Sequence, residues 1–369
     1  MPRLSTMIGQ DAAIARLRKA IANAALGHAY LFAGPAGVGK TATARALAKA
    51  LNCDEAGPMM GAGDSCEICP ACRQSDAGSH PDIHLVRPSL IESEGAGRRP
   101  SVEILIDQVR EMNRMISLSP SVGRRKVFIV TPAEAMNEQA QNALLKSLEE
   151  PPALSTIILC AESAESLLPT IQSRCQVIPF GLAPRALIEL RLRELFGLTP
   201  EEARVTAALS QGRVGVAIRL ARDPGWREAR TRLLDMIEQA ISGDPLGALR
   251  SAIPLREQCQ KVPVMIDALG GGAQESASDR VAGRIQLQML FEEIATIVRD
   301  LMVLHLEGGE DLVVNLDRKD SLARLAKSRA SADWRRALTH IMSAQDLLRR
   351  NVNTQLLIED VLLDLTWTG

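Results

Sequence analysis

A glycine-rich octapeptide, residues 34–41 with the sequence GPAGVGKT, restricts the possible folds of this chain more than any other feature. It fits the pattern G-x-x-x-x-G-K-[ST] and lies between a short apolar run, Ala29 to Ala33, and a helical pattern that begins at Lys40. Such a loop binds phosphate where it joins a strand to a helix, and both neighbours are of the required type. The octapeptide therefore predicts an α/β fold with a phosphate site, and an accidental glycine-rich turn is the alternative.

Each part of the octapeptide has an expected role in phosphate binding. Glycines allow positive φ and let the backbone approach a ligand closely, so that N–H groups at the start of the helix face the phosphate oxygens. Lys40 is expected to reach the β and γ phosphates, and Thr41 to offer a hydroxyl to Mg²⁺. The predicted ligand is ATP with Mg²⁺, and the predicted binding residues are Gly34, Pro35, Ala36, Gly37, Val38, Gly39, Lys40 and Thr41.

Short apolar runs and helical patterns alternate over the first part of the chain. Lys126–Val130 and Thr156–Cys160 read as further strands, and the helical segment between them, Glu138–Glu150, ends at two prolines. Strands that are separated by helices form parallel sheets covered by helices on both faces. We expect residues 1–180 to form a P-loop α/β core of this kind.

The strand signals fade after this core. Thr199-Pro200 is typical of a helix start, and three helices fit residues 181–224. From residue 225 to 369 the period is helical almost throughout. The sequence thus predicts a core, a small three-helix domain and a larger all-helical domain.

Four of the seven cysteines gather in a module, residues 53–72, that follows the first helix of the core: Cys53, Cys66, Cys69 and Cys72. The last three form C-x-x-C-x-x-C, and four thiolates suit a closed, structural Zn²⁺ site. The segment between the first two is polar and glycine-rich, so a metal would supply order that the segment lacks. An iron–sulfur cluster and unmetallated thiols are the alternatives.

Charge and composition argue against several classes of protein. The 43 basic and 44 acidic side chains nearly cancel and aromatic residues make up 2%, which disfavours a zinc-dependent nucleic-acid-binding protein with its own basic or base-stacking surface. No apolar run is long enough to span a membrane, and the N-terminus lacks the apolar segment of a signal peptide. We expect a cytoplasmic protein with no membrane partner.

Four features occur in this sequence in the same order as in one known family. They are the phosphate loop, the cysteine module, the segment 142–152 with the sequence NALLKSLEEPP, and Ser173-Arg174-Cys175. Together they resemble the bacterial DNA polymerase III clamp-loader subunits, which belong to the AAA+ class. The likeness covers about the first 225 residues and implies an AAA+ core, a helical lid and an all-α collar that joins subunits.

Three departures distinguish this sequence from the ATP-hydrolysing gamma or tau motor of that family. The motor has an Asp-Glu pair directly after its second strand, where this chain has Thr131 and Pro132. Polar threonines that sense the γ-phosphate are replaced at Cys160 to Glu162, and the arginine of a second sensor is replaced by Gly215. These losses beside an intact loop favour the delta-prime branch, which implies an accessory subunit of DNA polymerase with weak or no ATPase activity of its own.

Two charged residues lie near these departures. Glu134 is interpreted as an ordinary acid at a helix start, and a substitute general base is the alternative. Arg213 is offset by two residues from the sensor position, so we expect it on a different side of the helix.

The resemblance also implies a role for Arg174. In the family the Ser-Arg-Cys segment faces the neighbouring subunit, and its arginine acts on that neighbour's γ-phosphate as an arginine finger. An exposed loop arginine is the alternative. The implied partners are the gamma/tau and delta subunits and, through the complex, the sliding clamp and primed DNA. The alternative function is an ATP-hydrolysing gamma/tau-type motor or another AAA+ ATPase.

Overall fold

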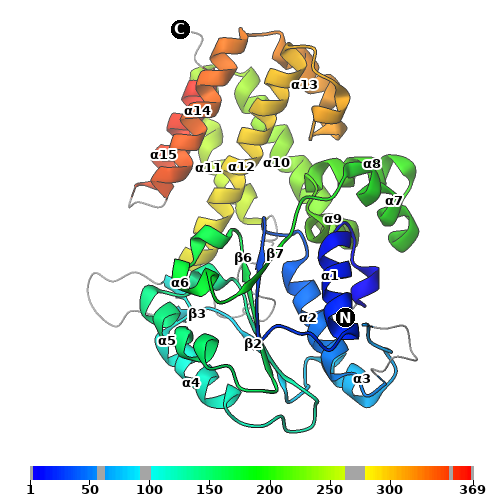
Figure 1. Cartoon of the computed structure of the whole chain (residues 1–369). Helices are drawn as coiled ribbons and strands as arrows, with labels where there is room; N and C mark the ends of the chain where they lie inside the picture. The colour runs from blue at the N-terminus through cyan, green and yellow to red at the C-terminus, as the bar shows by residue number, and fades with distance from the viewer. Residues whose placement is uncertain (1–2, 56–62, 92–100, 262–278, 349–351, 367–369) are drawn as a thin grey trace. The chain divides into compact units, whose positions relative to one another are not determined.

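A computed structural model describes residues 3–55, 63–91, 101–261, 279–348 and 352–366 (Figure 1). The chain divides into two compact units. The first contains the residues up to Ile188 together with Gly212–Val216, and the second contains Glu189–Gln211 and most of the residues from Ala217 onward. The finer division into three domains, with boundaries near residues 180 and 224, stays a prediction.

The first unit is built around a five-stranded sheet with the strand order β2-β5-β6-β1-β7, in which every neighbouring pair is parallel. The strands are β1 (Ala29–Ala33), β2 (Ile83–Val86), β5 (Lys126–Val130), β6 (Ser155–Ala161) and β7 (Gln176–Pro179). The three strands predicted from sequence, β1, β5 and β6, are confirmed and lie next to one another. The two edge strands were not predicted, because both are short and keep exposed or half-exposed side chains.

Helices precede and connect the strands of this unit. They are α1 (Asp11–Ala22), α2 (Lys40–Asn52), α3 (Pro70–Ala77), α4 (Ile106–Ile116), α5 (Glu138–Glu149) and α6 (Pro169–Gln172). Short 3-10 helices in the described part of this unit are η1 (Leu4–Thr6), η3 (Ala133–Ala135) and η4 (Ala164–Ser166). A separate antiparallel pair is formed by β3 (Ser89–Ile91) and β4 (Ser101–Glu103).

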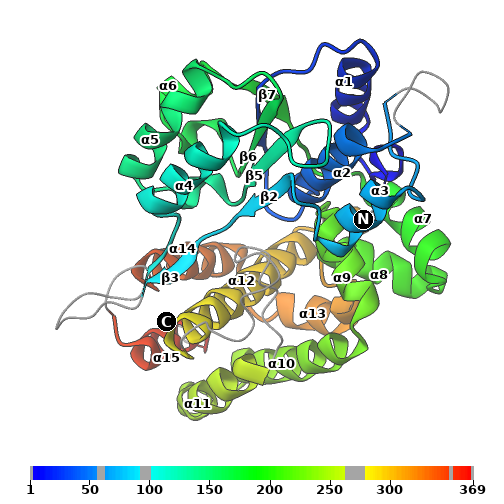
Figure 2. The ribbon, with the colours of Figure 1, turned by 90° about the horizontal axis from the view of Figure 1, so that it is seen from below.

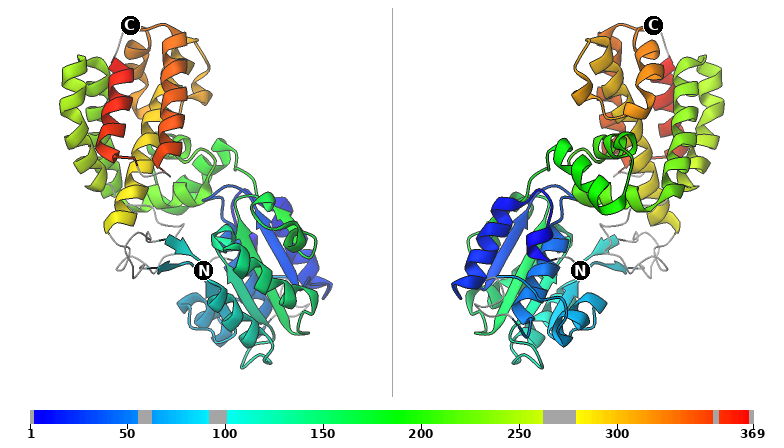
Figure 3. Two further views of the ribbon diagram at one scale, coloured as in Figure 1. Left: turned by 90° about the vertical axis from the view of Figure 1, so that its left-hand side faces the viewer. Right: turned by 90° about the vertical axis from the view of Figure 1, so that its right-hand side faces the viewer.

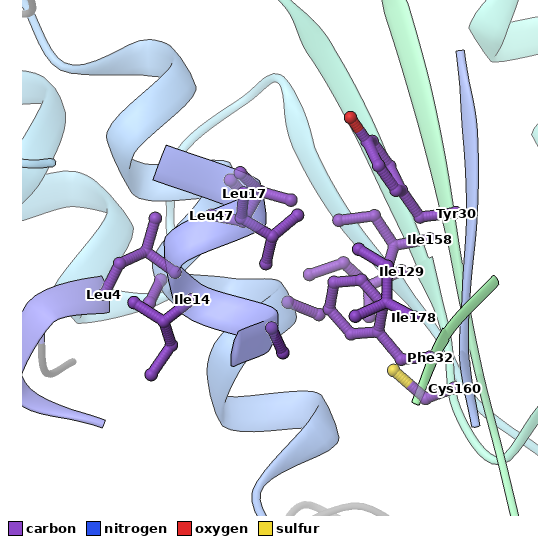
Figure 4. Close-up of a cluster of buried hydrophobic side chains, with 14 of the residues drawn as sticks. Leu4, Ile14, Leu17, Tyr30, Phe32, Leu47, Ile129, Ile158, Cys160 and Ile178 are labelled. Carbon is purple, nitrogen blue, oxygen red and sulfur yellow. The ribbon is translucent and has the colours of Figure 1, made fainter. Parts of the chain in front are cut away.

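Both faces of the sheet are covered, α1 and α2 on one and α4 and α5 on the other (Figure 2). Successive side chains of a strand point to opposite faces, so Tyr30 and Phe32 join the first layer while Leu31 joins the second. Figure 4 shows the first layer, in which Leu17 and Leu47 of the helices face the strand residues. The predicted class, a P-loop α/β core with helices on both faces, is confirmed.

The remaining chain is helical, as predicted. Its helices are α7 (Arg185–Phe196), α8 (Pro200–Ser210), α9 (Val214–Arg222), α10 (Pro224–Ser242), α11 (Pro245–Lys261), α12 (Asp279–His305), α13 (Lys319–Ala326), α14 (Ser331–Leu348) and α15 (Thr354–Thr366), with 3-10 turns η5 (Glu310–Leu312) and η6 (Leu316–Arg318). Thr199 caps α8 in a capping box with Glu202. In the second unit α12 packs on α13 and α14, and α11 packs on α10 and α15 (Figure 3).

The carboxyl ends of β1, β5 and β6 meet at one edge of the sheet, because the three strands are parallel neighbours. Open parallel sheets bind ligands at this edge. The residues that follow these strands therefore form the first place to look for a site.

Candidate functional site

The predicted phosphate loop joins the end of β1 to the start of α2, with Gly39 as the N-cap. Gly37 and Gly39 have φ values of +79° and +105°, a backbone region that residues other than glycine rarely adopt. Gly34 has no room for a side chain, since a Cβ there would lie 2.0 Å from the Phe180 carbonyl oxygen. Each glycine thus has a physical reason to be a glycine.

The other residues of the loop differ in how far they are exposed to solvent. Pro35 and Ala36 are exposed, whereas Val38 is buried in the layer beneath α1 and α2. The tip of the turn is therefore accessible to a ligand, and the side chain of Val38 anchors the loop in the core.

Lys40 is buried, and its ammonium group lies inside the loop. Its Nζ donates hydrogen bonds to the carbonyl oxygens of Gly34 and Pro35, the second at 2.8 Å. Burial lowers the pKa of Lys40, and the nearby acidic groups of Cys160, Glu134 and Glu162 oppose that shift. A cation held in this way attracts an anionic ligand, since a phosphate would offset the cost of burying it.

Thr41 contacts the first residue after β5. Its Oγ1 lies 2.9 Å from Oγ1 of Thr131, and the next residue, Pro132, offers neither charge nor N–H. Mg²⁺ in phosphate sites is bound through one or two carboxylates. Thr41 therefore supplies the hydroxyl that a magnesium site needs, but its hydrogen-bond partner here is a second hydroxyl instead of a carboxylate.

The segment after β6 and the short helix η3 complete this edge. Glu134 in η3 accepts a hydrogen bond from the Glu162 N–H at 3.3 Å, and burial, reinforced by the charge of Glu162, raises its pKa. Cys160 is fully buried, which raises the pKa of its thiol to about 12. Cys160 is thus a neutral core thiol. Glu134 is half-buried: its Oε1 accepts the Glu162 N–H, whereas its Oε2 has no hydrogen-bond partner among the described residues.

Gly215, where the motor's second sensor arginine is expected, packs against the phosphate loop. Its N–H donates to the Gly37 carbonyl oxygen at 2.7 Å, and a Cβ on Gly215 would lie 2.9 Å from the same oxygen. The expectation that Arg213 lies on another side of the helix is wrong. Arg213 precedes α9, and its side-chain carbons pass beside Gly37.

Gln10 is a residue of this site that sequence reasoning missed. Its amide exchanges hydrogen bonds with Gly181, at 2.7 Å from Nε2 to the carbonyl oxygen and 3.2 Å from the N–H to Oε1. Nε2 also donates to the Val38 carbonyl oxygen at 3.3 Å. This buried glutamine fixes the phosphate loop to the chain that leaves β7, and a single polar residue before a helix gave no signal of that.

The four predicted cysteines come together at the other end of α2. Cys53 is the C-cap of α2, Cys69 is the N-cap of α3, and Cys72 lies in its first turn. The four sulfur atoms lie within 4.8 Å of one another, and the pairs Cys53–Cys69 and Cys66–Cys72 are each 3.9 Å apart. Sulfurs at about 2.3 Å from a tetrahedral zinc ion are roughly 3.8 Å apart, so this cluster has the size that one metal ion requires.

The thiols of this cluster are buried and unequal. Burial raises the pKa values of Cys53 and Cys72. Burial also acts on Cys66, but the N–H groups of Cys69 and Ile68 outweigh it and lower the pKa of that thiol to about 7. Without a cation Cys53 and Cys72 are therefore held as neutral thiols, and a metal ion bound here would have to displace their protons.

Charged side chains tie the N-terminal segment to the cysteine module. Asp64 accepts hydrogen bonds from the N–H groups of Leu4 and Ser5 at 3.0 and 2.9 Å, and Arg3 donates to the Cys66 carbonyl oxygen at 3.2 Å. Lys49 of α2, fully buried, contacts Asp76 of α3 at 2.8 Å. The module is thus held to the core by polar contacts as well as by its cysteines.

Arg174 lies in the short connection between α6 and β7, far along the chain from the phosphate loop. One terminal nitrogen contacts Oε1 of Glu149 at 2.7 Å, and the other donates to the Thr170 carbonyl oxygen at 3.0 Å. The side chain of Arg174 is 35% exposed. It is therefore held in one direction and still accessible from outside.

No helix in the described ranges combines the length and the apolar character that crossing a membrane would demand.

The known proteins that are similar to this chain include DNA polymerase III subunits of more than one name. A family model described as DNA polymerase III, delta subunit, matches residues 9–183. The DNA polymerase III subunit delta' of Pseudomonas aeruginosa is 37% identical over 234 residues, which cover 62% of this chain and 67% of that protein. The subunit delta' of Bacillus subtilis is 29% identical over 339 residues, 92% of this chain and 90% of that protein.

DNA polymerase III subunits named tau are also similar to this chain, but over part of their length. The DNA polymerase III subunit tau of Salmonella typhimurium is 29% identical over 332 residues, which cover 86% of this chain and 47% of tau. The chain thus spans about half the length of that relative.

Proposed function

The chain belongs to the delta-prime family of DNA polymerase III clamp-loader subunits, and on that premise we propose that it binds nucleotide without hydrolysing it and activates a neighbouring ATPase site. It would act as the stator of a ring with gamma/tau and delta subunits. That ring would place the sliding clamp on primed DNA, so the chain would be an accessory subunit of the polymerase and not its motor.

One observation carries the proposal that its own site does not hydrolyse ATP. Directly after β5, where a carboxylate is needed, the Thr131 hydroxyl lies against Thr41 and Pro132 follows. Phosphoryl transfer depends on neutralising charge and on orienting the attacking group. A site with a hydroxyl pair and a proline at this point lacks the groups for both tasks.

Nucleotide binding itself rests on the loop, residues 34–41. Gly37 and Gly39 let the backbone turn its N–H groups towards phosphate at the start of α2. Lys40 supplies a buried cation beside them. Because Thr41 has no carboxylate partner, we propose that any Mg²⁺ enters with the nucleotide and adds little to its affinity.

Arg174 is proposed to complete the site of a neighbouring subunit. The guanidinium supplies fixed positive charge where an ATPase develops negative charge in its transition state. Its partial exposure and its two contacts support this assignment, because a finger has to reach outward in a defined direction.

The cysteine module is proposed to hold one structural Zn²⁺ through Cys53, Cys66, Cys69 and Cys72. The donor set is closed and buried, which is typical of structural and not of catalytic zinc. When bound, the ion would neutralise the thiolates. The protein's own part is to position them from the ends of α2 and α3.

The test uses the clamp-loader complex reconstituted from this chain and its gamma/tau and delta partners. Arg174→Ala should leave assembly intact and lower the turnover of ATP by the complex by about a thousandfold at the site that it contacts, the size of effect known for arginine fingers. An unchanged rate at every site of the assembled complex would contradict the proposed role.

A second measurement separates a stator from a motor. The purified chain alone should bind a fluorescent ATP analogue and release no measurable phosphate in the presence of primed DNA. Turnover by the chain at a motor's rate would favour the gamma/tau-type alternative, with Glu134 as its base.

A further inference from the structure

Glu149 stands at an unfavourable place in its helix. It is the last residue of α5, and Glu150 caps that helix. The carboxyl end of a helix carries a partial negative charge, so two acidic side chains there cost stability unless a cation compensates them. Arg174 is such a cation for Glu149, at 2.7 Å.

Both partners of this ion pair stand on anchored elements. Leu148, next to Glu149, is buried, and the Ser147 hydroxyl donates to the Asn113 side chain at 2.7 Å. On the other side, Ile171 of α6 is fully buried, and the Leu168 N–H donates to the Gln141 side chain of α5 at 2.9 Å. The end of α5 and the start of α6 are thus fixed to each other, and the pair joins two rigid supports.

The guanidinium group of Arg174 has more N–H donors than these contacts use. It has five N–H groups in a planar fork. One terminal nitrogen is used by Glu149, and the other by the Thr170 carbonyl oxygen and, at 3.4 Å, by the Ser173 hydroxyl. Two contacts on different nitrogens fix the plane of the fork. The part of the chain that the structure describes offers its remaining N–H groups no acceptor, which leaves them for another anion.

We propose that Glu149 is a positioning residue for Arg174: it aims the guanidinium at the phosphate site of the neighbouring subunit. This rests on the proposed role of Arg174 in trans. Glu149 does not touch the reacting atoms. It acts by reducing the number of directions in which a long, flexible side chain can point before the neighbour's nucleotide arrives.

The pair contributes little to folding, and that makes the proposal testable. The two side chains are 35% and 50% exposed, and ion pairs of this kind are screened by solvent. Removing Glu149 should therefore leave the chain folded and the complex assembled. The loss should appear in the rate at which the neighbour hydrolyses ATP.

The experiment measures ATP turnover by the reconstituted complex with clamp and primed DNA present. Glu149→Ala should lower kcat about tenfold and leave KM for ATP unchanged, because the chemical step loses its oriented charge while ATP binding is kept. Glu149→Gln, which retains an acceptor but no charge, should lie between Glu149→Ala and the unsubstituted complex. Glu150→Ala is the matched control, an adjacent exposed acid at the same helix end, and should leave kcat unchanged.

A double substitution distinguishes positioning from an independent effect. Glu149→Ala combined with Arg174→Ala should be no slower than Arg174→Ala alone, since a positioning residue has nothing to position once the arginine is gone. A further loss in the double variant would overturn the proposal. So would a kcat for Glu149→Ala that equals or exceeds that of the unsubstituted complex.

The two proposals fail in different ways. If Arg174→Ala slows the complex and Glu149→Ala does not, Glu149 is no positioning residue and the finger stands. If Arg174→Ala leaves every site at full rate, the finger is wrong and the positioning role falls with it. Assembly of each variant is checked by gel filtration, and if Glu149→Ala fails to assemble, an unchanged kcat of the Glu149→Gln complex counts against the proposal.

Discussion

The two ends of helix α2 are built in different ways. Its first turn is the phosphate loop, which is held by hydrogen bonds between groups of the chain itself: Lys40 to two loop carbonyls, Gln10 to Val38, and Gly215 to Gly37. Its last turn leads to Cys53, where four buried thiols face one another. At the first end the loop is held by hydrogen bonds of the chain itself, and the second end is a cluster of groups that a cation would complete.

Polar contacts also support the second end from the side. Asp82 accepts hydrogen bonds from the N–H groups of Ser121, Val122 and Gly123 at 2.7–2.9 Å. The same turn continues to Arg125, whose N–H donates to the Asn52 side chain at the end of α2. The difference between the ends suggests that loss of a metal would disturb the fold, whereas loss of a nucleotide would not.

The largest expected effect is at the cysteine end. Cys72→Ser should abolish binding of one zinc per chain and lower the free energy of unfolding by about 4 kcal/mol, because loss of a metal site is among the most destabilising single changes. Metal analysis and thermal unfolding measure both. Cys259→Ser is the control: this buried cysteine donates to the Gln286 carbonyl oxygen outside the cluster and should retain the zinc. Equal zinc content in the two variants would refute a four-cysteine site.

Asp82→Asn tests how much of that end is held without metal. Burial alone would raise the pKa of Asp82, but three backbone N–H groups outweigh it and lower the pKa. The variant should lose about 2 kcal/mol at pH 7. Because the three N–H groups stabilise the ionised carboxylate in the folded chain, this difference should persist above about pH 4, the unfolded pKa. It should vanish as the pH falls through the folded pKa.

Denaturant titrations at pH 7 and at a pH low enough to protonate Asp82 in the folded chain make this measurement. Asp107→Asn, at a side chain that is 82% exposed, should change stability little at either pH. A loss for Asp82→Asn that does not depend on pH would mean that the carboxylate charge is not what holds the turn.

Gly215→Arg restores the arginine that the motor carries and tests the close packing at the loop end. A Cβ there approaches the Gly37 carbonyl oxygen to 2.9 Å, so we expect a loss of about 1.5 kcal/mol from overpacking and weaker binding of nucleotide, with no gain in hydrolysis. Gly181→Arg is the control, because a Cβ at Gly181 meets no atom within 4 Å. Equal stability of the two variants would show that the loop yields to the added side chain.

The smallest effect on folding is expected from Lys40→Ala. The variant loses two hydrogen bonds but also the cost of burying a cation, so the free energy of unfolding should change by less than about 0.5 kcal/mol. Nucleotide affinity, measured by fluorescence titration, should fall roughly 10- to 100-fold, the worth of a charge-assisted hydrogen bond. Lys19→Ala on the exposed face of α1 should alter neither quantity.

Strong local patterns identified much of the fold in advance. A few adjacent residues are enough to predict each of three features: the phosphate loop at residues 34–41, the three apolar strands and the helix start at Thr199-Pro200. The edge strands β2 and β7 were missed because they have half-exposed sides and carry no continuous apolar run. Their pairing with β5 and β1 depends on partners far away in the chain.

The sequence by itself determined which groups are present: a loop with three glycines, four cysteines at short spacing, and Thr131 and Pro132 in place of carboxylates directly after β5. Only the tertiary structure decided what those groups touch. It brought Gly215 onto Gly37, Gln10 onto Gly181, and Glu149 onto Arg174. These contacts join segments distant in sequence, and their geometry arises from the packing of whole helices and strands, which no local pattern records.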